Sequence, residues 1–161
     1  MSRTFGDALP DSLFERLSGR DLQAVSDRVI VVCTVDDRGY PHPALLSYLE
    51  TIAVDRRTIR LAMYSSSRST QNARRDGRLT LILVDDRVAY YIKGTVEELT
   101  RSMSVAPRNA KLQFHIAEVL ADEANPQLEP GAYIASGLTY INPRRAAALE
   151  QAHQLLAALS E

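Results

Sequence analysis

One polar segment of the sequence, residues 64–72, has residue types suited to binding a phosphate group. Five hydroxyl side chains surround the guanidinium of Arg68: Ser65, Ser66, Ser67, Ser69 and Thr70. Hydroxyls and the N–H groups at a helix N-terminus donate hydrogen bonds to phosphate oxygens, and arginine can bind a phosphate through two parallel hydrogen bonds. The same residue types also build ordinary loops and helix caps. Local composition alone leaves both interpretations open.

The other side chains that could do chemistry are isolated in the sequence. Cys33 is the single cysteine and lies in an apolar run, which predicts a buried structural thiol and excludes a disulfide within one chain. His42, His115 and His153 include no pair at metal-ligand spacing, so we expect no metal site. No arrangement of serine, histidine and aspartate typical of a hydrolase can be argued, and no catalytic residue is assigned.

Two further sets of charged residues have structural interpretations. The acidic pairs at 36–37 and 85–86 fall between apolar runs, where aspartate favours turns, and we expect them to be solvated. Arg74 and Arg75 are expected on an exposed helix face, from which one of them could assist a phosphate.

Composition and charge limit the classes of partner. The chain has 161 residues, of which 45% are hydrophobic and 24% charged, with a formal net charge of −1. This is the composition of one globular domain, and its balanced charge gives no reason to expect nucleic acid or an anionic membrane as partner. No segment reads as a signal peptide or approaches the roughly 20 apolar residues of a membrane span, so a cytoplasmic location is expected.

The pattern of apolar residues predicts which elements position these side chains. Within a single domain over 1–161, we expect a helical lead-in over 1–27, a barrel over 28–141 and a C-terminal helix over 142–161. Residues 111–122 fit both a strand and a helix, and we favour a strand. The remaining predicted strands cover 28–35, 43–53, 58–64, 78–84 and 88–99, and a short helix covers about 69–76.

The predicted fold class is mostly β, an antiparallel β-barrel with flanking helices, since runs of antiparallel strands of this number usually close to remove their edges.

The helices expected outside the barrel include a short one over about 20–27 and the terminal helix over 142–161. In the terminal helix, Asn142 is expected at the N-cap and Pro143 at the first helical position. The helix presents a leucine stripe that must pack against the barrel or a second subunit: Leu149, Leu156 and Leu159.

Four motifs in a fixed order extend the interpretation of the polar segment. They are GYPHPALLSYL over 39–49, SSSRSTQN over 65–72, RLTLILV over 78–84 and YYIKGTVEEL over 90–99. In this order and spacing the chain resembles, over roughly residues 29–99, the pyridoxamine 5'-phosphate oxidase-like family of FMN-binding split β-barrels. The resemblance implies an antiparallel split barrel that acts as a homodimer, with FMN in a cleft between subunits.

The resemblance also implies roles for individual residues. The flavin ring and ribityl chain would lie along His42, Pro43, Ala44, Leu45, Leu46 and Ser47. Tyr64 and Ser65 would continue the wall. The phosphate would be held by Ser67, Arg68 and Ser69, with Thr70 and Asn72 close by. Ala89 falls where many relatives place a glutamine that contacts the flavin from the neighbouring subunit.

Two departures from the family pattern limit what the resemblance implies. Ser69 stands where the vitamin B6 oxidases have a lysine, so the phosphate loop carries one less positive charge. The C-terminal segment of those oxidases, with its tryptophan, has no counterpart here, so oxidation of pyridoxamine phosphate is not expected. The hypothesis is an FMN-dependent oxidoreductase of unidentified substrate and electron donor. The alternatives are a non-catalytic flavin-binding or stress-associated module and a haem- or deazaflavin-binding relative.

Overall fold

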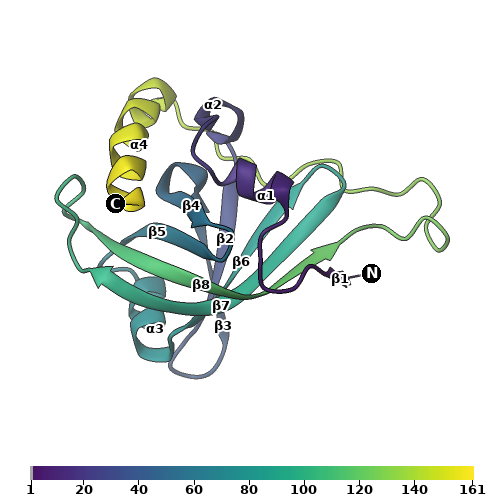
Figure 1. The fold of residues 1–161 in the computed structure, drawn as a ribbon, viewed down its shortest axis with the longest axis horizontal. Helices are drawn as coiled ribbons and strands as arrows, with labels where there is room; N and C mark the ends of the chain where they lie inside the picture. Colours follow the sequence, from purple (N-terminus) through teal and green to yellow (C-terminus); the bar gives the residue numbers. More distant parts are fainter. Residues whose placement is uncertain (1) are drawn as a thin grey trace.

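The computed structural model describes residues 2–161 as a strongly curved antiparallel sheet with helices packed at its margins (Figure 1). Among these residues the fold is mostly β, as predicted. The elements in chain order are β1 Ser2–Thr4, α1 Asp11–Arg16, α2 Leu22–Val25, β2 Val29–Val35, β3 Pro41–Ser47, the 3-10 turn η1 Tyr48–Glu50, β4 Thr51–Asp55, β5 Thr58–Tyr64, α3 Arg68–Asp76, β6 Arg78–Asp85, β7 Val88–Thr100, β8 Asn109–Asp122 and α4 Arg145–Ser160.

The strand order of the sheet is β3-β2-β6-β7-β8-β5-β4, and β1 pairs with β8. The sheet is not closed by hydrogen bonds as a complete barrel would be, because within residues 2–161 the edge strands β3 and β4 do not pair. These two edges are consecutive in the chain and are joined only by η1. The gap between them is where side chains from both ends of the sheet can meet.

The predicted strand over 43–53 is interrupted at η1. Ser47 caps this turn, since its Oγ accepts a hydrogen bond from Leu49 N at 3.0 Å and the carboxylate of Glu50 accepts one from Ser47 N at 3.2 Å. This is the reciprocal capping box, whose signature of serine and glutamate three residues apart is present in the sequence. The capping box ends β3 and turns the chain into β4.

Several predicted elements are confirmed and others are corrected. Residues 111–122 form a strand, as favoured, and the helix expected over 20–27 is reduced to Leu22–Val25. The N-cap assignment of Asn142 is wrong. Its Oδ1 accepts a hydrogen bond from Arg144 N at 2.9 Å, which makes a turn through Pro143 before α4 begins at Arg145. The strand β1 was not predicted.

The acidic turns differ from one another. Asp36 Oδ1 accepts hydrogen bonds from Arg38 N and Tyr40 N, as expected for a turn. The expectation that the 85–86 pair is solvated is wrong for Asp85, which pairs with Arg16 at 2.5 Å and is only 24% exposed. This ion pair ties α1 to the end of β6.

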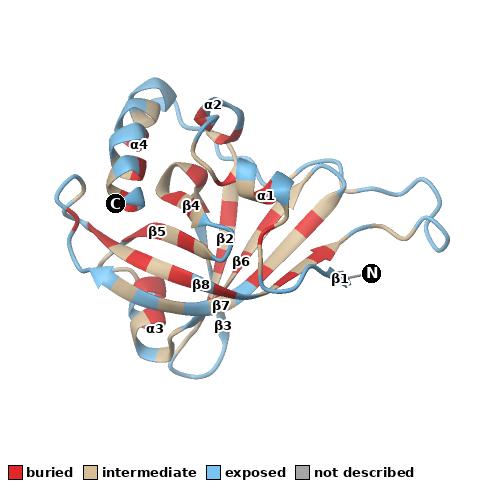
Figure 2. Ribbon diagram, viewed as in Figure 1, coloured by how far each residue is buried: buried red, intermediate tan, exposed pale blue. Residues whose placement is uncertain are grey.

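The core has two parts, which appear as the red stretches in Figure 2. The larger part lies inside the curved sheet around the fully buried ring of Phe114. The second lies between α4 and the sheet and contains Leu22, Ala62, Met103, Ala152, Leu156 and Leu159, with Leu149 packed against it. The leucine stripe of the terminal helix therefore packs against the same chain, over η1, β4 and β5.

Two cations hold the C-terminal end of α4. Arg60 Nη1 donates to Leu159 O and Lys111 Nζ donates to Ala158 O, each at 2.8 Å. Carbonyls at the end of a helix lack intrahelical partners and attract positive charge. Burial lowers the pKa of Lys111, with Arg60 adding to the effect.

Candidate functional site

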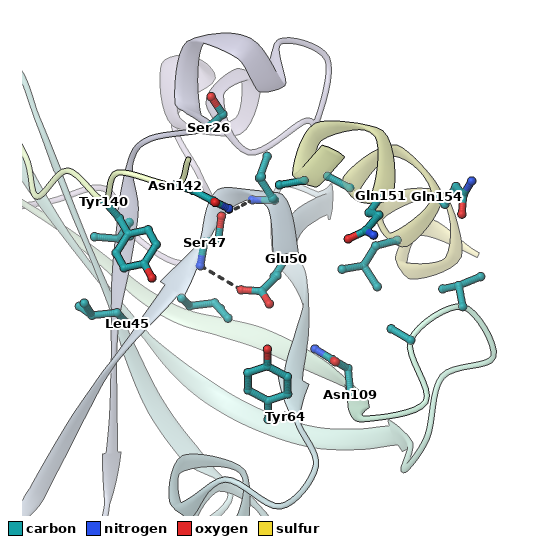
Figure 3. Close-up of a pocket in the computed structure, with 18 residues that line it drawn as sticks. Ser26, Leu45, Ser47, Glu50, Tyr64, Asn109, Tyr140, Asn142, Gln151 and Gln154 are labelled. Carbon is teal, nitrogen blue, oxygen red and sulfur yellow. Dashed lines mark hydrogen bonds between the residues drawn. The ribbon is translucent and has the colours of Figure 1, made fainter. Parts of the chain in front are cut away.

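A cavity of about 810 Å³ lies beside the gap between β3 and β4. Its walls come from the end of β3, η1, the end of β5, the start of β8, residues 140–142 and α4. Figure 3 shows these walls around one space. Ligand pockets of small-molecule sites typically measure about 300–1,000 Å³, so the cavity has the size of a ligand site.

Four of the residues predicted from the resemblance line this cavity: Leu45, Leu46, Ser47 and Tyr64. The other predicted residues lie outside its walls: His42, Pro43, Ala44, Ser65, Ser67, Arg68, Ser69, Thr70, Asn72 and Ala89. Residues 42–44 occupy the earlier part of β3, where they pair with β2. The loop 65–67 and α3 directly follow Tyr64.

The hydroxyl groups of Ser67 and Thr70 are used within the α3 cap. Ser67 Oγ accepts from Thr70 N at 3.1 Å and donates to Thr70 Oγ1 at 3.0 Å. Thr70 is fully buried, and its hydroxyl donates to Tyr64 O at 2.9 Å. Arg68, by contrast, is exposed at the first position of the helix. The loop is therefore a helix cap that leaves one guanidinium facing solvent.

Asn72 and Ala89 are both buried, Asn72 where α3 packs on β2 and Ala89 within the sheet. Asn72 is buried, and its Nδ2 donates to Thr34 Oγ1 at 3.1 Å, which ties α3 to β2. Ala89 is buried near the start of β7, whereas α3 contacts Glu98 near the end of the same strand, roughly 30 Å further along. Contact between Ala89 and a ligand at α3 would have to come from a second copy of the chain.

The expectation that Arg74 and Arg75 form an exposed helix face is wrong for Arg74, which is half-buried, and is confirmed for Arg75, which is exposed. Arg74 Nη1 and Nη2 donate to Ser65 O and Ser65 Oγ at 2.8 and 2.9 Å, and its Nε donates to Glu98 Oε2 at 2.7 Å. Arg75 Nη2 donates to Val35 O and to Asn72 Oδ1. Both guanidiniums donate to backbone carbonyls, one in the loop before α3 and one at the end of β2. Arg74 therefore fixes the position of Ser65 in the loop.

Replacement of Arg74 by lysine is expected to lower the free energy of unfolding by about 1–3 kcal/mol, because an ammonium cannot span Ser65 and Glu98 as the planar guanidinium does. Urea denaturation measures this loss, and hydrogen exchange at residues 65–67 should quicken. Arg78→Lys is the matched control, since Arg78 is exposed and its ion pair is with Asp76, two residues earlier in the chain. Equal midpoints for the two variants would contradict the role assigned to Arg74.

Sequence reasoning missed the polar residues that give the cavity its chemistry. Glu50, Asn109 and Gln151 come from η1, β8 and α4, and Figure 3 shows their side chains directed with that of Tyr64 toward one space. Burial raises the pKa of Glu50, and the hydrogen bond from Ser47 N opposes this shift. Only the serine-to-glutamate spacing of the capping box could have drawn attention to Glu50.

A second, smaller cavity of about 470 Å³ lies over the outer face of β2, β6 and β7. Cys33 lines it and is partly exposed, so the prediction of a buried thiol is wrong. The reason is the alternation of β2, whose odd-numbered residues face outward. The nearby cations Arg78 and Lys93 already pair with Asp76 and Glu118.

Residues 2–161 offer neither a cluster of metal ligands nor a membrane-spanning helix. No group of three or more histidine, cysteine, aspartate or glutamate side chains is placed to hold a metal ion. No helix in this part of the chain is long and apolar enough to cross a membrane.

Comparison with known proteins places this geometry in context. The family model for pyridoxamine 5'-phosphate oxidase matches residues 21–132. The uncharacterised protein YclD of Bacillus subtilis is 33% identical over 87 residues, which cover 54% of this chain and 56% of that protein. The match thus spans little more than half the length of this relative.

Solved structures share the fold. A proposed pyridoxamine 5'-phosphate oxidase from Lactobacillus delbrueckii is 16% identical, with a TM-score of 0.58 over 74% of this chain and 98% of that chain. HupZ from Group A Streptococcus is 15% identical, with a TM-score of 0.55 over 69% and 91%. At such identities these likenesses establish the fold alone.

Proposed function

The chain belongs to the pyridoxamine 5'-phosphate oxidase family, and from this premise we propose that it binds FMN and acts as a flavin-dependent oxidoreductase. The single observation that carries the proposal is that the cavity adjoins the α3 cap. Tyr64 lines the cavity and directly precedes the loop that caps α3. The proposal includes a homodimer and the cytoplasmic location expected from the sequence.

The residues around the start of α3 fit the phosphate of FMN. The hydrogen bonds of the helix begin with Thr70 N and Gln71 N, both donating to Ser67. The N–H groups of Arg68 and Ser69 precede them and so have no acceptor within the helix. These two N–H groups, the exposed Arg68 guanidinium and the hydroxyls of Ser65 and Ser66 would hold the phosphate. Thr70 and Asn72 would hold the loop and α3 in place through their hydrogen bonds to Tyr64 O and Thr34 Oγ1.

The cavity walls fit the rest of the cofactor. Leu45 and Leu46 offer apolar surface at the end of β3, and Tyr64 lies between this surface and the phosphate loop. When bound, FMN supplies electron and hydride transfer, and the protein supplies its position and electrostatic surroundings. We assign no acid or base for the reaction.

Arg68→Ala is expected to weaken FMN binding about 10- to 150-fold, because a charge-assisted hydrogen bond contributes about 1.5–3 kcal/mol. Quenching of flavin fluorescence during titration measures the affinity. Arg38→Ala removes an equal charge from the exposed β2–β3 turn and should leave the affinity unchanged. If the unmodified protein shows no saturable binding at micromolar FMN, the proposed function fails.

One observation favours an alternative without turnover. Ala89 lacks the polar side chain with which the family pattern would contact the flavin from the second subunit. Reduction by NADH or NADPH separates the two functions, since flavin that binds but is never reduced by these or other donors would indicate a binding module. A Soret band on adding haem, or preference for a deazaflavin over FMN, would indicate the remaining alternatives. Sedimentation tests the dimer.

A further inference from the structure

The described side chains that line the cavity beside η1 include one acidic group and no basic group. Among the described residues that line it, Glu50 bears the single carboxyl group, and none is lysine, arginine or histidine. The other polar groups of its walls are neutral hydroxyls and amides. A phosphate or carboxylate inside this cavity would meet a carboxylate and no cation.

The carboxylate of Glu50 is held in place by the backbone. Its Oε2 accepts the hydrogen bond from Ser47 N at 3.2 Å, and across residues 2–161 this is the single hydrogen bond that the structure gives the group. The second oxygen is directed to the cavity, where Figure 3 shows the carboxylate facing the central space. Fixed by the capping box, the carboxylate can present this oxygen to a ligand without reorganisation.

Neutral donors and acceptors surround the carboxylate. Tyr64 and Asn109 are directly paired residues of β5 and β8, and both side chains face the cavity. Gln151 faces it from α4. The helix α4 lies beyond residues 21–132, the part of the chain that matches the family model. One wall of the cavity is therefore a feature of this chain rather than of the matched segment.

These side chains determine which ligand charge the cavity favours. An opposite charge placed next to a half-buried carboxylate is attracted more strongly than it would be in water, and a like charge is repelled. A ligand with several N–H donors would pair with Glu50 and with the amide oxygens of Asn109 and Gln151. An anion would lose its hydration without gaining a cationic partner.

We propose that this cavity takes a ligand, or part of one, that places a positive charge or several N–H donors against Glu50, and that it rejects anions. For the proposed function, on which this substrate class rests, the substrate is an amine, an amidine or an N–H-rich heterocycle rather than a carboxylate or phosphate ester. The charge preference of the cavity itself can be measured without flavin.

Three nearly isosteric probes test the preference: benzamidine, benzamide and benzoate, which carry one positive charge, no charge and one negative charge. Isothermal titration at pH 8, with and without FMN, gives their affinities. The unmodified protein should bind benzamidine at least about tenfold more tightly than benzoate, with benzamide between them. Glu50→Gln should reduce this ratio to within about twofold, because glutamine preserves the capping box but not the charge.

The control variant is Asp37→Asn, which makes the same charge change at the exposed β2–β3 turn and should keep the full preference. Equal or tighter binding of benzoate, a preference that survives Glu50→Gln, or no binding of any probe at millimolar concentration would each overturn the proposal. A benzamidine preference in a protein that does not bind FMN would uphold the cavity's selectivity and reject the flavin function. FMN binding without any charge preference among the probes would uphold the flavin function and reject the selectivity of the cavity.

Discussion

Gly94→Ala is expected to lower the free energy of unfolding by at least about 3 kcal/mol, the range reached when a core position is overpacked without room to relax. Gly94 lies at the irregularity where the β7–β8 register shifts. A Cβ atom there would lie 2.0 Å from His115 O and within 2.9 Å of the Phe114 ring. The carbonyl belongs to the adjacent strand and the ring is fully buried, so neither can move aside without opening the centre of the sheet.

Thermal or urea denaturation measures the effect, with Thr95→Ala as the matched control. Thr95 follows on the same strand and is exposed, so its truncation should change stability by less than about 0.5 kcal/mol. A Gly94→Ala variant as stable as the control would mean that the two strands separate locally at little cost. The bulge would then not be the rigid point that the structure indicates.

Gly94 also illustrates what the sequence could and could not reveal. Alternation along β6, β7 and β8 predicts strands, because one face of each is buried in the core and the other is not. The glycine within this pattern signals a bulge or a close backbone approach, but its partner, the carbonyl of His115, is known only once the register of β7 and β8 is known.

Some features of the candidate site could likewise be predicted from the sequence, and others could not. The α3 cap could be predicted, since Ser67, the polar helix and Gly77 are adjacent in the chain and act locally. The connection of Arg74 to Ser65 and the convergence of Glu50 with Gln151 could not, because they depend on how the two edges of the sheet approach each other. Local capping by Glu50 also explains why one predicted strand proved to be two.

The second large effect is expected at the helix that closes the cavity. Leu156→Asp places a carboxylate in the buried cluster beneath α4, where Leu156 contacts the region of Gly19 and Ile52. An unpaired charge in such a cluster costs several kcal/mol, and detachment of the helix relieves that cost. We expect α4 to leave the sheet while the strands stay folded, since the main core around Phe114 does not include this helix.

Hydrogen exchange distinguishes this local opening from general unfolding. The amides of α4 should lose protection by at least about tenfold, whereas those of β6, β7 and β8 keep theirs. His153→Asp introduces the same charge on the exposed side of the helix and should leave protection intact. With α4 detached, the cavity loses one wall and Glu50 is exposed to water, which weakens its attraction for a cation. Benzamidine should then lose most of its advantage over benzoate even though the carboxylate remains. If exchange quickens equally across the sheet, α4 is part of one cooperative unit with the core, and the cavity cannot open without unfolding the protein.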